Sequence, residues 1–151
     1  MSSGLKRILL VEDNPMDAEL ALHALEEQRV AHEIVVLQDG ADALDYLLQR
    51  GSFVSRSPGP PVVAFLDLKM PRVDGLTLLR EMKAHGSLRT IPVVMLTSSR
   101  EEQDLIRSYE AGVNAYVVKP VDFQQYVEAV QKLGQFWASV NEPPPLPRTS
   151  G

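Results

Sequence analysis

The sequence predicts an α/β protein in which a doubly wound, five-stranded parallel sheet is covered by helices on both faces. Three observations predict this class. Short apolar runs alternate with amphipathic stretches, most connections between them are short, and the apolar runs are continuous. Strands and helices that alternate in this way form a parallel sheet with right-handed crossovers. The length of 151 residues suits one domain with one hydrophobic core.

The first half of the chain predicts two strand–helix pairs. Residues 6–11 form a short apolar run, and Asn14-Pro15 supplies an N-cap and a first helical residue for the next helix. A strand over residues 33–37 leads to a helix opened by Asp39-Gly40. The predicted inward stripes of the two helices are Leu20, Ala21, Ala24 and Leu25, and then Ala43, Leu44, Leu47 and Leu48. A loop rich in Ser, Pro and Gly follows at residues 51–61.

The second half predicts three more pairs. A strand over residues 62–66 precedes a helix over residues 75–84. After a strand at residues 92–96, Ser99 and Glu102 match a capping box, which predicts a helix from Ser99 to Gly112. The fifth strand covers residues 114–118. Asp122 is the predicted cap of the last helix, whose expected inward residues are Phe123, Val127 and Val130.

Composition excludes several classes of protein. The formal net charge is −5 and no basic run is present, which argues against nucleic-acid binding. The absence of cysteine excludes disulfides, and no apolar stretch is long enough for a signal peptide or a membrane span. We therefore expect a cytoplasmic protein with a disordered N-terminus at residues 1–5, one domain with an extended last helix at 6–140, and a flexible Pro-rich tail at 141–151.

Polar residues follow four of the five predicted strands. Glu12-Asp13, Asp67, Thr97 and Lys119 each stand at or just after the end of an apolar run. Ligands bind at the carboxyl edge of such a sheet, so we expect these side chains to gather there. Carboxylates and a phosphate suit Mg²⁺, and Lys119 suits a phosphoryl oxygen. A lone Asp is more often a helix cap or a structural acid, but the four partners favour Asp67 as a nucleophile that forms an acyl phosphate.

The order of these motifs carries a family resemblance. The chain resembles the receiver domain of two-component response regulators over residues 6–133. The motifs are Glu12-Asp13, Leu66-Asp67-Leu68-Lys69-Met70-Pro71, Asp74-Gly75, Thr97 and Lys119-Pro120. Each motif alone is weak, but five in this order are specific. The resemblance implies a flavodoxin-like fold with strand order 2-1-3-4-5.

The resemblance also implies roles for individual residues. Asp67 is expected to accept a phosphoryl group from a sensor histidine kinase and to lose it by slow self-dephosphorylation, without acting as an enzyme. The implied Mg²⁺ ligands are Glu12, Asp13, Asp67 and the backbone carbonyl of Lys69. The residues implied to contact the phosphoryl group or to switch with it are Thr97, Ser98, Lys119 and Tyr116. The Lys119-Pro120 peptide bond is implied to be cis.

A narrower resemblance points to the phytochrome-associated response regulators. It depends on the long loop 50–61, the segment 91–97 and the helical tail 135–139. This subgroup implies a phytochrome as the partner kinase and a homodimer formed through the last helix and its extension. The expected dimer contacts are Leu133, Phe136 and Trp137.

Two other functions remain open on the residues alone. A phosphatase of the haloacid-dehalogenase type also uses an aspartyl nucleophile, but it needs a second Asp two residues later, where this chain has Lys69. The other alternative is an interaction module that is never phosphorylated. Because only a Pro-rich stretch follows the last helix, we expect no DNA-binding output domain.

Overall fold

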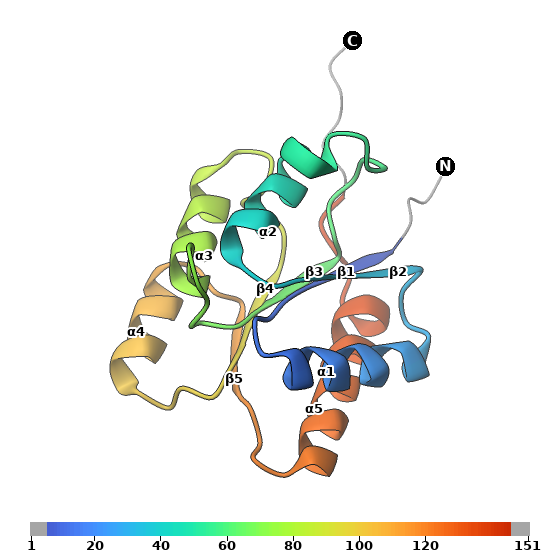
Figure 1. The fold of residues 1–151 in the computed structure, drawn as a ribbon, viewed down its shortest axis with the longest axis vertical. Helices are drawn as coiled ribbons and strands as arrows, with labels where there is room; N and C mark the ends of the chain where they lie inside the picture. Colours follow the sequence, from blue (N-terminus) through green and yellow to red (C-terminus); the bar gives the residue numbers. More distant parts are fainter. Residues whose placement is uncertain (1–5, 146–151) are drawn as a thin grey trace.

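Five strands form one parallel sheet in the spatial order β2-β1-β3-β4-β5, which confirms the predicted fold class (Figure 1). The computed structural model describes residues 6–145, so the termini predicted to be disordered lie mostly outside it. The strands are β1 (Arg7–Val11), β2 (Glu33–Leu37), β3 (Val63–Leu66), β4 (Val93–Thr97) and β5 (Ala115–Val118). The helices are α1 (Pro15–Gln28), α2 (Gly40–Leu47), α3 (Gly75–Ala84), α4 (Glu102–Glu110) and α5 (Phe123–Gln135). A 3-10 turn, η1 (Gly51–Phe53), and a π-helical turn, η2 (Phe136–Val140), complete the order.

The central strands are buried on both faces and divide the core into two layers. Alternate residues of β1, such as Ile8 and Leu10, face α1 and α5, whereas Leu9 and Val11 face α2 and α3. Helix α4 lies beside β5 and α3 at the edge of the second layer (Figure 1). This two-sided burial explains why the strands are continuous apolar runs.

Polar side chains start four of the five helices. Each accepts a hydrogen bond from the backbone N–H three residues later, which satisfies a donor that the helix itself leaves free. The four caps are Asn14, Asp39, Asp74 and Asp122. The predicted caps of the first and last helices are thereby confirmed, and Asp39, predicted to open the second helix, proves to be its cap.

Two local predictions are wrong. Helix α4 begins at Glu102 and has no side-chain cap, because the hydroxyl of Ser99 instead lies 2.5 Å from the Asp104 carboxylate. Phe123 is 62% exposed, whereas Tyr126 is buried against the sheet in its place. The predicted inward set, which starts at Phe123, and the set that contains Tyr126 and Val130 both have helical spacing. Contact with the sheet selects the second set.

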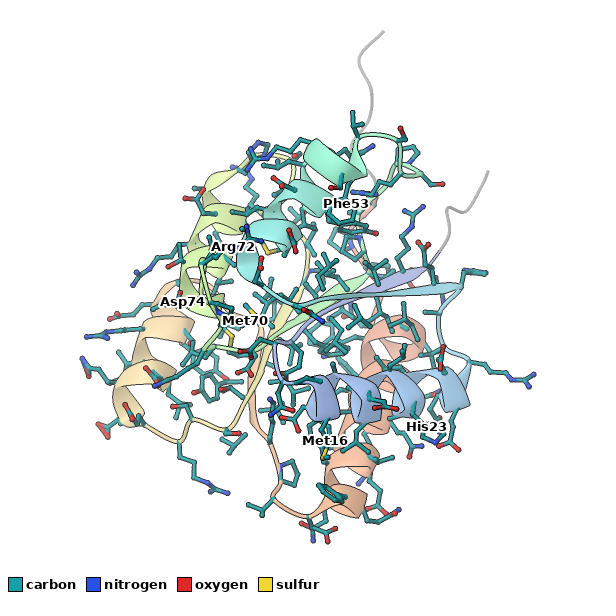
Figure 2. The ribbon with its side chains drawn as sticks, in the orientation of Figure 1. Met16, His23, Phe53, Met70, Arg72 and Asp74 are labelled. Atoms are coloured by element: carbon teal, nitrogen blue, oxygen red, sulfur yellow. The ribbon has the colours of Figure 1, made fainter. Side chains whose placement is uncertain are left out.

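The loop between β3 and α3 is closed tightly on itself and tied to α2. The backbone N–H of Gly75 donates to Leu68 O at 2.8 Å. Arg72 adopts a left-handed φ of 63° and forms a bidentate pair with the Asp39 carboxylate, with its shortest N–O distance at 2.7 Å. Figure 2 shows Met70, Arg72 and Asp74 along this loop, with the side chain of Met70 almost fully buried. The loop that follows Asp67 is therefore closed by one backbone hydrogen bond and anchored to the start of α2 by Arg72.

The first strand is also tied to the end of the last helix. Lys6 Nζ donates to the backbone oxygen of Ala138 at 2.8 Å, and Ala138 itself is buried. The π-helical turn η2 thus belongs to the packed domain and continues the layer formed by α1 and α5.

Gly75 offers a test of how closely the β3–α3 loop packs on the end of β3. A Cβ atom at this position would collide with the backbone oxygen of Asp67. We expect Gly75→Ala to lower the free energy of unfolding by about 1–3 kcal/mol because the backbone must move. Urea titration measures the change. Gly86→Ala is the matched control, since a Cβ there meets no atom within 4 Å, and an equal loss in both variants would contradict the prediction.

Candidate functional site

The carboxyl ends of four strands bring the predicted site residues to one edge of the sheet. Val11 and Leu66 are level in the register of β1 and β3, so Glu12 and Asp67 are neighbours. The backbone N–H of Asp67 donates to Val11 O at 3.0 Å, which extends the pairing past the strand. Parallel register therefore sets two carboxylates side by side.

Three carboxylates converge at this edge. Oxygen atoms of Glu12, Asp13 and Asp67 all lie within 4.8 Å of one another. Glu12 and Asp67 are only 2% and 9% exposed, whereas Asp13 is open to solvent. A group of hard oxygen donors that is buried on one side and open on the other fits a divalent cation that keeps part of its water shell.

Lys119 provides the positive charge of the cluster. Its Nζ lies 2.6 Å from Glu12 Oε1, 2.9 Å from Asp17 Oδ2 and 3.1 Å from Asp67 Oδ2. The side chain is 6% exposed, and an ammonium has three N–H donors, so each donor has a carboxylate partner. Burial of this lysine is tolerable because it is fully hydrogen-bonded to opposite charges.

Asp17 is the site residue that the sequence analysis did not identify. An acid is common in the first turn of a helix because it interacts favourably with the helix dipole, so the presence of an Asp here did not indicate a role in the site. Its position did indicate such a role. Helix α1 starts only three residues after Glu12, so its first turn lies over the same edge of the sheet.

Carboxylates outnumber the cation in this cluster, and the pKa values reflect the excess. Burial raises the pKa of Glu12 to about 7, and the neighbouring Asp67 carboxylate adds to the effect. Burial alone would lower the pKa of Lys119, but its bonds to Glu12 and Asp17 outweigh burial and raise that pKa above the ordinary value. A buried cluster with excess carboxylates therefore favours any added positive charge, whether a proton or a bound cation.

An open cavity of about 420 Å³ lies against Asp67. Its lining residues are Asp67, Lys69, Thr97, Ser98, Ser99, Arg100 and Glu101. Thr97 is buried and its hydroxyl accepts from the backbone N–H of Ser99 at 3.3 Å, whereas Ser98 is exposed. Three residues of the predicted set, Lys69, Thr97 and Ser98, thus surround the space in front of Asp67.

Tyr116 reaches the same loop from β5. Its hydroxyl donates to the backbone oxygen of Ser99 at 3.0 Å, and its ring packs against the core layer beneath α2 and α3. The loop after β4 is therefore held by Thr97 on one side and Tyr116 on the other.

The Lys119–Pro120 peptide bond is trans, so the expectation of a cis bond is wrong. Trans is the favoured isomer even before proline, by about 0.5–1 kcal/mol. The lysine ammonium reaches three carboxylates from the trans backbone, so its contacts require no cis bond.

The three predicted dimer contacts differ in exposure. Leu133 and Trp137 pack against the layer formed by α1 and α5 of this same chain. Phe136 is 45% exposed and stacks edge-to-face on Trp137, with ring centroids 5.0 Å apart. Beside Phe136 is a groove of about 410 Å³, lined by Gln28, Glu128, Gln131, Lys132, Gln135, Phe136 and Val140.

Comparisons with known proteins agree on one family. The response regulator receiver domain matches residues 8–131. Response regulator Rcp1 of Synechocystis sp. is 40% identical over 132 residues, which cover 87% of this chain and 88% of Rcp1. The structure of its Mn²⁺-bound form superposes with a TM-score of 0.86 at 38% identity and covers 93% of this chain and 99% of that one.

Two further solved structures are similar along almost their whole length. The phosphorylated cyanobacterial phytochrome response regulator RcpA has a TM-score of 0.88 at 38% identity, with 94% of this chain and 100% of that chain covered. The bacteriophytochrome response regulator AtBRR is 61% identical, with a TM-score of 0.73 and coverage of 93% and 100%. Among residues 6–145, no helix is both long and apolar enough to cross a membrane.

The raised pKa of Glu12 predicts how stability changes with pH. Because the folded pKa of about 7 exceeds the ordinary value of 4.5, the folded state binds more protons between these two values. The contribution of Glu12 to stability is therefore complete below the lower value and is lost as pH rises through the higher one. Wild type should lose this contribution between about pH 5 and pH 8, whereas Glu12→Gln has no carboxyl group to titrate. With a chelator present, we therefore expect the free energy of unfolding of Glu12→Gln, measured relative to wild type, to rise by about 2 kcal/mol across this pH range.

Urea titrations at several pH values measure this difference. Glu26→Gln, which removes an exposed acid on α1, is the control and should leave the pH dependence as in wild type. A constant difference between Glu12→Gln and wild type across the range would show that Glu12 has no raised pKa.

Proposed function

The chain belongs to the response regulator receiver domain family, and we propose that Asp67 is its phosphoryl acceptor. The observation that carries the proposal is the position of Asp67 Oδ2, 3.1 Å from Lys119 Nζ and beside the carboxylates of Glu12 and Asp13. These neighbours are the groups that phosphoryl transfer to a carboxylate requires, because the reaction depends mainly on positioning and charge stabilisation.

The reaction moves a phosphoryl group from a histidine nitrogen of a sensor kinase to a carboxylate oxygen of Asp67. The P–N bond breaks, a P–O bond forms, and the histidine nitrogen keeps the electron pair. Lys119 then donates to a phosphoryl oxygen from the N–H that had bonded Asp67 Oδ2. Thr97, which lines the same cavity, would donate its hydroxyl proton to a second phosphoryl oxygen.

Mg²⁺ is the proposed cation of the site. Glu12, Asp13, Asp67 and the backbone carbonyl of Lys69 would hold it, and all four supply the oxygen ligands that this ion prefers. When bound, Mg²⁺ would neutralise the charge that builds up as a phosphoryl group meets the carboxylates. The Mn²⁺-bound Rcp1 structure supports a divalent cation in a relative of this chain.

The site favours a switch over a turnover phosphatase. Lys69 stands two residues after Asp67, where a haloacid-dehalogenase phosphatase requires an acid, so no carboxyl is placed there to protonate a leaving group. The acyl phosphate would then be lost only by slow self-dephosphorylation. A charged phosphoryl group at Asp67 would draw Thr97 toward it and release the Ser99 contacts to Thr97 and Tyr116, which changes the loop before α4.

A bacteriophytochrome is the proposed donor kinase. AtBRR and RcpA, both phytochrome response regulators by description, match more than nine-tenths of this chain. Phosphotransfer requires both proteins in one compartment, which for a sensor kinase and its regulator is the cytoplasm.

We also propose that the chain forms a homodimer through α5 and η2. Phe136 and Val140 are 45% and 65% exposed beside the groove at the end of α5, so an aromatic anchor and an apolar neighbour are available to a second copy. Exposed aromatic side chains of this kind often carry most of the binding energy at interfaces.

Incubation with a small phosphodonor and Mg²⁺ tests the acceptor. We expect the intact protein to gain the mass of one phosphoryl group. Asp67→Asn should gain none, because an amide replaces the nucleophilic carboxylate. Asp45→Asn, an acid on α2 away from the site, should gain it as wild type does. No gain in wild type, or a gain in Asp67→Asn, would overturn the proposal. The same measurement with a phosphorylated bacteriophytochrome in place of the small donor tests the kinase.

Sedimentation of Phe136→Glu tests the dimer. We expect the variant to dissociate at least about tenfold more readily than wild type, since a buried anchor would become a charge. Phe123→Glu is the matched control, because Phe123 is an exposed aromatic at the opposite end of the same helix. A wild-type protein that stays monomeric at every concentration, or equal dissociation of both variants, would argue against this interface.

A further inference from the structure

Asp17 contacts the proposed phosphate-binding lysine from a helix that the expected chemistry does not use. Its Oδ2 lies 2.9 Å from Lys119 Nζ, and its side chain is 29% exposed. Met16, the preceding residue, is 58% exposed and points away from the sheet in Figure 2. The first turn of α1 therefore directs Asp17 toward the cluster and Met16 away from it.

The backbone of Asp17 is held on both sides. Its N–H donates to the Asn14 side chain at 3.0 Å, and its carbonyl oxygen accepts from the Tyr126 hydroxyl at 3.3 Å. Tyr126 is itself buried between α5 and the sheet. A carboxylate carried by such a backbone has a defined position, as a residue that orients another group requires.

The three donors of Lys119 have different fates in the proposed reaction. One N–H of Lys119 bonds Asp67, the residue that becomes phosphorylated. This N–H is the one that would bond a phosphoryl oxygen after the transfer. Glu12 and Asp17, which accept the other two N–H groups, would keep them during the transfer. Without one of them, the flexible four-carbon stem of lysine could rotate about the remaining contact.

We propose that Asp17 is a positioning residue for phosphoryl transfer. Together with Glu12 it holds the ammonium of Lys119 at two points, so that the third N–H is directed at the oxygen of Asp67 that receives the phosphoryl group. The inference rests on the proposed function of Asp67. It adds that α1 contributes to the site through a side chain, in addition to its packing against α5.

Asp17 also lies at the N-terminus of a helix, where any acid contributes to helix stability. Asp17→Ala and Asp17→Asn separate the two roles, because both remove the charge but only asparagine keeps an oxygen that can accept from Lys119. Glu19→Ala is the control, since Glu19 is an exposed acid on the same helix. Urea titration of all variants verifies that each is folded.

The first measurement is the rate of phosphoryl gain from a small phosphodonor at saturating Mg²⁺. We expect Asp17→Ala to react about tenfold more slowly than wild type, because a misdirected donor in a preorganised site costs rate. Asp17→Asn should stay within about threefold of wild type, since the oxygen acceptor is retained, and Glu19→Ala should match wild type. Equal rates for Asp17→Ala and Asp17→Asn, or a wild-type rate for Asp17→Ala, would overturn the proposal.

The second measurement does not depend on phosphorylation. The ammonium protons of Lys119 should give a slowly exchanging NMR signal in wild type and Asp17→Asn, and this signal should be lost in Asp17→Ala. If wild type gains no phosphoryl group, the proposed function fails, whereas the NMR signal still decides whether Asp17 holds the lysine. An unchanged signal in Asp17→Ala would reject the positioning role.

Discussion

The arrangement of side chains at this edge of the sheet depends on two buried carboxylates that follow neighbouring strands and whose charges must be compensated. Glu12 and Asp67 follow β1 and β3, whose register makes them adjacent. Like charges at such close range, out of water, would repel strongly. The ammonium of Lys119 bridges them from β5, two strands away from β3 in the sheet, and so links three strands at one point.

This arrangement makes the cluster sensitive to any change in its charge. A site with more carboxylates than cations is ready to exchange protons and metal ions, because each added positive charge relieves repulsion. The loop after β4 borders the same cavity, and its Ser99 backbone donates one hydrogen bond to the Thr97 hydroxyl and accepts one from the Tyr116 hydroxyl. Each hydrogen bond of this kind makes a small net contribution to stability, so the proposed switch would need to break only weak contacts.

Local sequence patterns predicted most of the fold and the membership of the acidic cluster. Strands appeared as apolar runs, and Asn14 and Asp122 were identified as caps, because these features depend on neighbouring residues alone. Features set by distant contacts were missed or misjudged. Two helical spacings were available in α5, and only packing against the sheet turns Tyr126 inward and Phe123 outward. The bond between Asp17 and Lys119 joins residues that are far apart in the sequence, and the only local pointer to it was the start of α1 just after Glu12.

The hydrogen bond from Lys6 to Ala138 has a consequence for the connectivity of the chain. It brings the start of β1 and the end of the last helix together on a part of the molecule outside the acidic cluster. A short linker between these two segments would permit circular permutation, with new ends opened in the loop between η1 and β3. The order of strands in space would be preserved although their order in sequence changed. Such a permutant would show whether the geometry of the sheet edge depends on the order in which the strands are synthesised.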